Sequence, residues 1–316
     1  MLQGHEEPSR QWQAAVGSDK LHHAWLLSGP RGIGKMHFAI EAGRKLVGGD
    51  APATEHPDIH ILSQLPKDEK EDKKRAEGKP FERKRNIGVG QVRSMQKRLT
   101  TRPTLGDKRV IIIDAADDME RSASNALLKS LEEPPTGSHF LLVSHQPSKL
   151  LPTIRSRCRV LRFAALSEEQ LRHVLAKQDV DATPEALDAA IEGANGSPGL
   201  ALQLIALKLG EVRKAMAHIL EGGDPHFEAR AALANAIGQR PDRERLAAIV
   251  SLARSLLAKN MANGSREDFS SRHTAYLECE RLAAEIATFN YDSGLLAMEI
   301  GSLLANAARP TKRHYA

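Results

Sequence analysis

The segment GPRGIGK over residues 29–35 has the residue types and spacing of a phosphate-binding loop. Its glycines allow successive backbone N–H groups to turn toward a phosphate, and the start of a helix adds partial positive charge. Lys35 follows where a side chain can reach the outer phosphates of a nucleotide. A glycine-rich turn without a ligand is the alternative. We favour the P-loop because an apolar run, 24–28, precedes it and a helix is predicted over about 36–47.

Two positions needed for hydrolysis carry unsuitable residues. Met36 stands where a P-loop uses a Ser or Thr hydroxyl for Mg²⁺, and a thioether is a poor ligand for this hard cation. A second apolar run ends in Asp114, where a magnesium-associated carboxylate is expected. ATPases of the oligomeric AAA+ class place a glutamate next, but Ala115 can neither accept a proton nor orient water. We therefore predict poor turnover, and residual binding of ATP or ADP stays open. The residues predicted to form this degenerate site are Gly29, Arg31, Gly32, Gly34, Lys35, Met36 and Asp114.

Apolar runs alternate with helical segments over the first half of the chain, which predicts a parallel α/β sheet. The runs 109–114 and 139–144 lack polar alternation, as expected of strands covered on both faces. After about residue 163 such runs stop, and alanine and leucine dominate. Ser167 with Gln170 forms a capping-box pattern that opens the first helix of this second half. Helix breaks are expected near 222–225, 240–241 and 263–264.

Composition limits the functional classes. The chain has 316 residues, two cysteines and 4% aromatic residues. The two separate cysteines indicate a reduced cytoplasmic protein without a disulfide framework. The N-terminal residues lack a signal-peptide pattern, and no apolar run is long enough for a membrane span. The scarcity of aromatic residues argues against a stacking platform for single-stranded nucleic acid.

The net charge of +5 is concentrated in one segment. Residues 67–85 contain nine Lys or Arg and six Asp or Glu, a local charge of +3. This mixed-charge segment, residues 66–86, is poor in apolar residues, so we expect a solvated, mobile loop. A nucleic-acid-binding module that uses its charges on phosphates is one alternative function.

Three phrases resemble the delta-prime subunits of bacterial DNA polymerase III clamp loaders: LHHAWLLSGP (21–30), NALLKSLEEPP (125–135) and IRSRC (154–158). The resemblance covers about residues 20–165, and beyond it extends only to length and helical character. It implies a RecA-like AAA+ P-loop domain (1–163), a small helical lid (164–206) and an all-α collar (207–316). The implied partners are motor (tau/gamma) subunits and a delta subunit in a hetero-pentamer, which loads the sliding clamp on primed DNA during chromosomal replication. The chain would be a cytoplasmic, non-motor part of a DNA-directed DNA polymerase (nucleotidyltransferase) holoenzyme that requires no cofactor or membrane.

The resemblance gives the motif Ser156-Arg157-Cys158 a role. Arg157 would enter the neighbouring subunit's ATP site as a trans-acting arginine finger, with Ser156 and Cys158 as its motif neighbours. A guanidinium can stabilise the charge that develops on the γ-phosphate. From residue types alone, a surface ion pair of Arg155, Arg157 or Arg159 is the better explanation. The motif reverses that preference for Arg157 only.

The departures from the family matter equally. Residues 48–66 contain no cysteine where many members carry a four-cysteine zinc module, so no zinc is expected. His56 and His60 are assigned to packing or the surface rather than to a metal. The second half reads Gly-Ser-Pro-Gly at 196–199, without the nucleotide-sensing arginine of motor subunits. A self-sufficient AAA+ ATPase, suggested by Lys35 and Asp114, is the remaining alternative.

Overall fold

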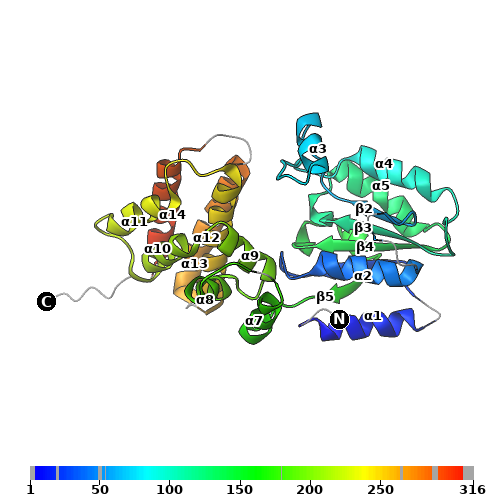
Figure 1. Ribbon diagram of the computed structural model, residues 1–316, viewed down its shortest axis with the longest axis horizontal. Helices are drawn as coiled ribbons and strands as arrows, with labels where there is room; N and C mark the ends of the chain where they lie inside the picture. Colours follow the sequence, from blue (N-terminus) through cyan, green and yellow to red (C-terminus); the bar gives the residue numbers. More distant parts are fainter. Residues whose placement is uncertain are drawn as a thin grey trace. The chain divides into compact units, whose positions relative to one another are not determined.

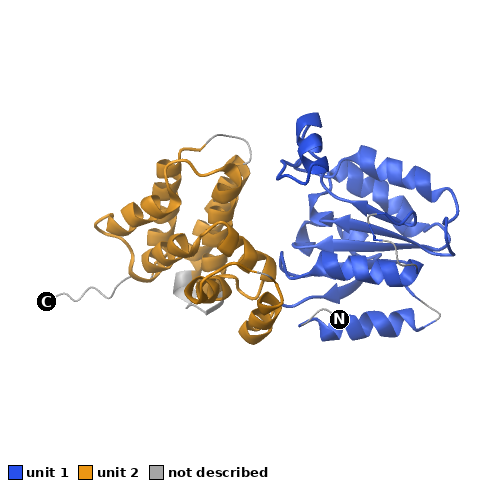
Figure 2. Ribbon diagram, viewed as in Figure 1, with its two compact units in different colours: residues 1–165 blue, residues 166–316 orange. Residues whose placement is uncertain are grey.

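The computed structural model describes residues 4–18, 21–48, 52–53, 55–178, 180–263, 266–286 and 291–308. The chain forms two compact units, residues 1–165 and 166–316 (Figure 2). The predicted separation of the second unit into lid and collar at residue 206 stays a prediction. The predicted domain limits include residues 1–3 and 309–316, and the predicted helix break at 263–264 includes residue 264. These residues lie outside the described part of the chain.

Unit 1 contains a parallel sheet, and its five described strands have the order β2-β3-β4-β1-β5 (Figure 1). The buried strands β3 and β4 are the unbroken apolar runs predicted to be covered on both faces. Because β4 separates β1 from β3, the P-loop and Asp114 follow strands that are not neighbours. The strands are β1 (Ala24–Ser28), β2 (Ile59–Leu62), β3 (Arg109–Asp114), β4 (Ser138–Ser144) and β5 (Arg159–Arg162).

Helices cover both faces of this sheet (Figure 1). On one face, apolar side chains of α4 and α5 join those of the strands in one core; Val92 and Leu127 are fully buried there. On the other face lie α1 and α2, where Trp12 packs edge-to-face on Trp25 with ring centroids 5.3 Å apart. The helices of unit 1 are α1 (Glu6–Val16), α2 (Lys35–Val47), α3 (Glu69–Ala76), α4 (Val89–Leu99), η1 (Ala116–Asp118), α5 (Arg121–Glu132), η2 (Pro147–Lys149) and α6 (Pro152–Arg155).

The mixed-charge segment contains helix α3, so the expectation of a loop is wrong at residues 69–76, whereas most of its residues are exposed to solvent as expected. Asp68 caps α3 by accepting a hydrogen bond from the Glu71 backbone N–H at 3.0 Å. The Glu71 carboxylate accepts from the Glu82 N–H at 2.7 Å, and Lys67 pairs with Glu82 at 2.6 Å. Polar contacts therefore order a segment that has few apolar residues to bury.

The described part of unit 2 consists of helices joined by turns. The predicted capping box is confirmed, since Ser167 Oγ accepts from Gln170 N at 3.2 Å and Gln170 Oε1 accepts from Ser167 N at 3.0 Å. The breaks predicted near 222–225 and 240–241 are also confirmed. No helix among the described residues combines the length and hydropathy needed to cross a membrane. The helices are α7 (Glu168–Ala176), α8 (Pro184–Gly193), α9 (Pro198–Ala206), α10 (Gly210–Gly222), α11 (Glu228–Ile237), α12 (Arg243–Asn263), α13 (Arg266–Ile286) and α14 (Ser293–Ala307).

Candidate functional site

The P-loop connects β1 to α2 through glycines that the backbone requires. A Cβ atom on Gly29 would lie 2.1 Å from the carbonyl oxygen of Phe163, so no larger residue fits. Gly32 and Gly34 have φ values of 76° and 100°, in the left-handed region that favours glycine. The chain thereby turns sharply at the carboxyl end of β1, and Lys35 becomes the first residue of α2.

Lys35 is enclosed by the P-loop itself. The residue is only 2% exposed. Its Nζ donates a 2.6 Å hydrogen bond to the Gly29 carbonyl and another hydrogen bond to the Pro30 carbonyl. Burial lowers the pKa of Lys35 to about 8, and the negative charges of Asp114 and Asp117 act against this shift. The ammonium group is therefore held in the site at an electrostatic cost.

A cavity of about 480 Å³ opens at this edge of the sheet. Its size lies within the range of small-molecule sites. Ala115, at the position of the missing glutamate, also lines it, whereas Gly29 lies outside the lining and serves the turn. The cavity brings together six predicted site residues: Arg31, Gly32, Gly34, Lys35, Met36 and Asp114.

Three further functional groups reach this cavity from residues that the sequence reasoning missed. Arg83 comes from the mixed-charge segment, Asp118 from η1, and His145 from the residue after β4. Only tertiary folding places them beside the P-loop, and the sequence carries no motif that marks them. Burial, together with the positive charges of Lys35 and Arg31, lowers the pKa of His145 to about 4.

The acidic residues of the site have different surroundings. Burial raises the pKa of both Asp114 and Asp118, against the effect of nearby cations. Gln64 Nε2 donates to Asp118 Oδ2 at 3.1 Å.

Asp117, by contrast, fixes the end of β4. Ser144 Oγ donates to its Oδ1 at 2.6 Å, and the backbone N–H groups of His145 and Gln146 donate to its Oδ2. The Ser144 hydroxyl is thus engaged in a hydrogen bond at the end of its own strand.

Arg157 lies at the opposite edge of the same sheet. It precedes β5, whose first residue, Arg159, pairs with Trp25 near the start of β1, so it belongs to the amino edge. Its Nη2 lies 2.7 Å from Glu132 Oε1, and its Nη1 donates to the Thr153 carbonyl at 3.0 Å. The ion pair considered from residue types alone is therefore present within the chain.

The Arg157 contacts leave the guanidinium accessible, because 35% of its side chain and 49% of that of Glu132 are exposed. Glu132 is the last residue of α5, where the helix dipole disfavours a carboxylate, and Arg157 offsets this. Cys158 is a packing residue: burial raises the pKa of its thiol to about 12. Ser156 is exposed, and Arg157 Nη1 lies 3.4 Å from its Oγ.

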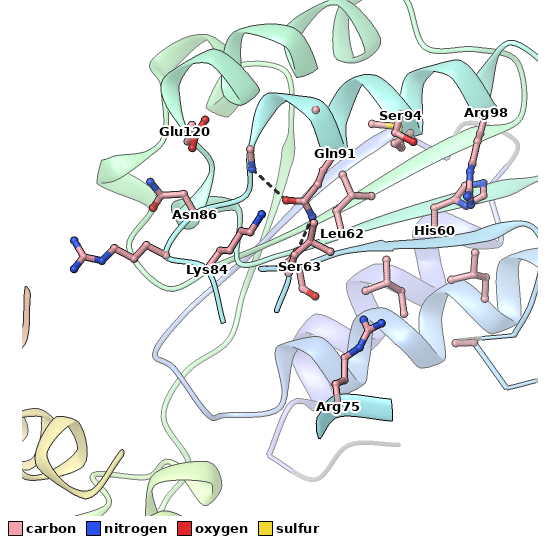
Figure 3. A pocket seen from close by; sticks show the side chains of 18 residues that line it. His60, Leu62, Ser63, Arg75, Lys84, Asn86, Gln91, Ser94, Arg98 and Glu120 are labelled. Atoms are coloured by element: carbon pink, nitrogen blue, oxygen red, sulfur yellow. Dashed lines mark hydrogen bonds between the residues drawn. The ribbon is translucent and has the colours of Figure 1, made fainter. Parts of the chain in front are cut away.

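A second cavity, of about 1120 Å³, lies along the free edge of β2 and the start of α4 (Figure 3). Arg75 and Lys84 of the mixed-charge segment line it, as do His60 and Arg98. Of the α4 residues Arg93, Lys97 and Arg98, only Arg98 lines this cavity. Within the described residues, no group of three or more His, Cys, Asp or Glu side chains could hold a metal ion.

The fold and the site together define a P-loop protein of the RecA-like AAA+ class whose nucleotide site carries Met36 and Ala115 at two positions used for hydrolysis. The chain belongs to the family described as "DNA polymerase III, delta subunit", whose model matches residues 4–167.

The relatives matched by sequence agree with this family. The chain is 35% identical over 230 residues to the DNA polymerase III subunit delta′ of Pseudomonas aeruginosa, covering 67% of this chain and 63% of that protein. It is 34% identical over 173 residues to the Escherichia coli subunit of the same name, covering 54% and 47%. The matched part thus spans between about half and just under two thirds of these relatives. A DNA polymerase III gamma-subunit-related protein of Thermotoga maritima aligns in structure over 96% of this chain and 100% of its own, with 19% identity and a TM-score of 0.49.

Proposed function

We propose that the protein is a delta-prime-type, non-motor subunit of a DNA polymerase III clamp loader. In this role it offers Arg157 to the ATP site of a neighbouring motor (tau/gamma) subunit, within a hetero-pentamer that also contains a delta subunit. The assembly opens the sliding clamp and places it on primed DNA in the cytoplasm. The chain's own domains act as the rigid P-loop domain (1–163), lid (164–206) and collar (207–316).

One observation carries this proposal: the chain's own nucleotide site lacks two residues used for hydrolysis, whereas the candidate arginine finger is present and accessible. The nucleotide site has Met36 and Ala115 where magnesium binding and water activation need a hydroxyl and a carboxylate. Arg157 keeps an accessible guanidinium at the other edge of the sheet. A subunit with these two edges can contribute charge to a neighbour's site while contributing little hydrolysis of its own.

The ion pair with Glu132 is compatible with a finger. An exposed ion pair contributes only about 0–1 kcal/mol, so exchanging the carboxylate for a γ-phosphate costs little. Arg157 stabilises transition-state charge best when its guanidinium fork faces phosphate oxygens in a site from which water is excluded. Glu132 would hold the side chain near the surface until the neighbour binds.

Assembly is the direct test of the subunit role. The full chain is mixed with motor and delta subunits of the same organism, and the product is weighed by native mass spectrometry. We expect a stable five-membered ring, and the same ring with the Arg157→Ala chain because Arg157 is not needed for folding. Absence of any complex with either partner would refute the proposal.

An ATPase with weak activity of its own is the second candidate, and Asp118 favours it. This carboxylate lines the P-loop cavity, so it could orient water in place of the missing glutamate. The isolated chain would then release phosphate in the presence of Mg²⁺, and Asp118→Asn would abolish the release. A rate no higher than that of the Lys35→Met chain would eliminate this candidate.

A further inference from the structure

The P-loop cavity gathers positive charge from distant parts of the chain. Within the described residues, the Lys and Arg side chains that line it are Arg31, Lys35 and Arg83. Lys35 is enclosed, whereas the residues Arg31 and Arg83 are exposed. The carboxyl groups that line the cavity are those of Asp114 and Asp118. The cavity therefore has an excess of donors suited to an anion.

Arg83 is held in position by the fold of the mixed-charge segment. Arg83 forms an isolated antiparallel bridge with Pro66, in which Lys67 N donates to Glu82 O at 3.0 Å and Lys84 N donates to Leu65 O at 2.7 Å. The guanidinium lies 4.8 Å from the centre of the Phe81 ring. These contacts place a cation beside the P-loop from a segment about fifty residues further along the chain.

The charge of Arg83 acts on the site itself. Together with Lys35 and Arg31, it opposes the rise in the pKa of Asp114 that burial causes. A guanidinium presents five N–H donors in a planar fork that matches phosphate oxygens. In an ordinary P-loop much of the phosphate charge is balanced by Mg²⁺, which needs a hydroxyl where this chain has Met36.

Lys35 gains from an anionic ligand as well. Its ammonium group now has two neutral carbonyl oxygens as hydrogen-bond partners. A phosphate would supply a full opposite charge to a group that burial penalises. The residues present therefore fit a polyphosphate, although they do not fit its usual magnesium ion.

We propose that the P-loop cavity binds the polyphosphate of a nucleoside di- or triphosphate without magnesium, and that Arg83 provides the counter-charge that Mg²⁺ provides elsewhere. This binding adds a ligand to a subunit that does not need to hydrolyse it. It is independent of the finger role of Arg157, which lies at the other edge of the sheet.

Calorimetric titration of ADP into the purified full chain tests the proposal. One titration contains magnesium chloride and the other contains EDTA. We expect the two dissociation constants to agree to within about twofold. Binding that requires magnesium, or no binding in either buffer, would overturn the proposal and would leave the assembly experiment unaffected.

Two variants of the mixed-charge segment separate Arg83 from general charge. Arg83→Gln should weaken ADP binding in EDTA by about tenfold or more, because a charge-assisted hydrogen bond is lost. Lys73→Gln removes one positive charge from an exposed residue of α3 that does not line the cavity, and should bind as the unaltered chain does. Thermal unfolding midpoints equal to that of the unaltered chain verify the fold. Equal affinity of the Arg83→Gln and unaltered chains would contradict the proposal.

Competition identifies the ligand class. Pyrophosphate should displace ADP, because the phosphates rather than the base contact the three cations. If pyrophosphate does not compete, the polyphosphate assignment is wrong. Displacement of ADP by a single-stranded oligonucleotide would assign the cavity to nucleic-acid phosphates instead and would likewise refute it.

Discussion

The carboxyl and amino edges of the sheet in unit 1 each carry a positively charged side chain, which is buried at the first edge and accessible at the second. At the carboxyl edge, Lys35 is 2% exposed and bonded to carbonyl groups of its own loop. At the amino edge, the Arg157 side chain is 35% exposed and paired with an accessible carboxylate. An enclosed cation suits a small ligand that enters a cavity, whereas an accessible one suits a site supplied by another molecule. The difference indicates which edge serves the chain itself and which serves a neighbour.

The connection between the edges explains why one fold supports both. Helix α5 follows η1 at the nucleotide edge and ends at Glu132, beside Arg157. Asp117 in η1 also ties down the chain after β4, which continues through η2 and α6 to the Ser156-Arg157-Cys158 motif. Both edges are therefore connected by the same elements, so the effects of substitutions at the two edges on stability can be compared directly.

The largest expected effect comes from the polar anchor at the nucleotide edge. Asp117→Ala leaves the Ser144 hydroxyl and two backbone N–H groups without their acceptor, so we expect a loss of about 2–4 kcal/mol in the free energy of unfolding. Urea denaturation measures this. Asp117→Asn, which retains one acceptor oxygen, should lose less. A loss equal to that of a surface substitution would show that the nucleotide edge is not organised by Asp117.

Lys35 gives an effect of intermediate size and opposite sign. Burial lowers its pKa to about 8 in the folded chain, so the charged form destabilises the fold below that pH. Lys35→Met removes this penalty but also loses hydrogen bonds, and should raise the free energy of unfolding at pH 7 by about 1–2 kcal/mol.

The same group sets a pH dependence. Between pH 8 and the unfolded-state value of 10.5, the unfolded chain binds more protons at Lys35 than the folded chain, so this residue's contribution makes stability rise with pH. Subtracting the Lys35→Met curve from that of the unaltered chain isolates the rise. A flat difference over this range would mean that Lys35 is not enclosed as described.

The smallest effects are expected at the finger edge. Arg157→Ala and Glu132→Gln each remove an exposed ion pair, so the free energy of unfolding should change by less than about 1 kcal/mol. Thermal unfolding of the two variants checks this. A larger loss from either would make the pair a structural element and would remove the contrast between the two edges.

The sequence predicted the elements that bury continuous apolar runs. The strand at 109–114 was found because both faces of β3 are covered. The sequence reasoning did not predict β5, because this edge strand buries only Leu161 and so has no continuous apolar run. It also did not predict α1, whose buried residues, Trp12 and Ala15 among them, are separated by polar ones. Helix α3 was missed because charged side chains rather than apolar burial hold it in place.

The candidate site was predictable to the extent that its residues are contiguous. The P-loop is one short motif, so its glycines and Lys35 could be identified directly. Arg83 and His145 reach the same cavity through tertiary folding alone. The sequence also could not identify Glu132 as the ion-pair partner of Arg157, because the two residues meet only when α5 and α6 pack side by side.

Phosphate release by the reconstituted loader is the most direct test of the contrast between the edges. One assembly carries Arg157→Ala and the other carries Lys35→Met in this subunit. We expect Arg157→Ala to abolish ATP hydrolysis at the neighbouring motor subunit's site, since arginine fingers contribute factors of about 10³ or more to turnover. The Lys35→Met assembly should retain the unaltered rate. A normal rate with Arg157→Ala together with a large loss with Lys35→Met would contradict the account.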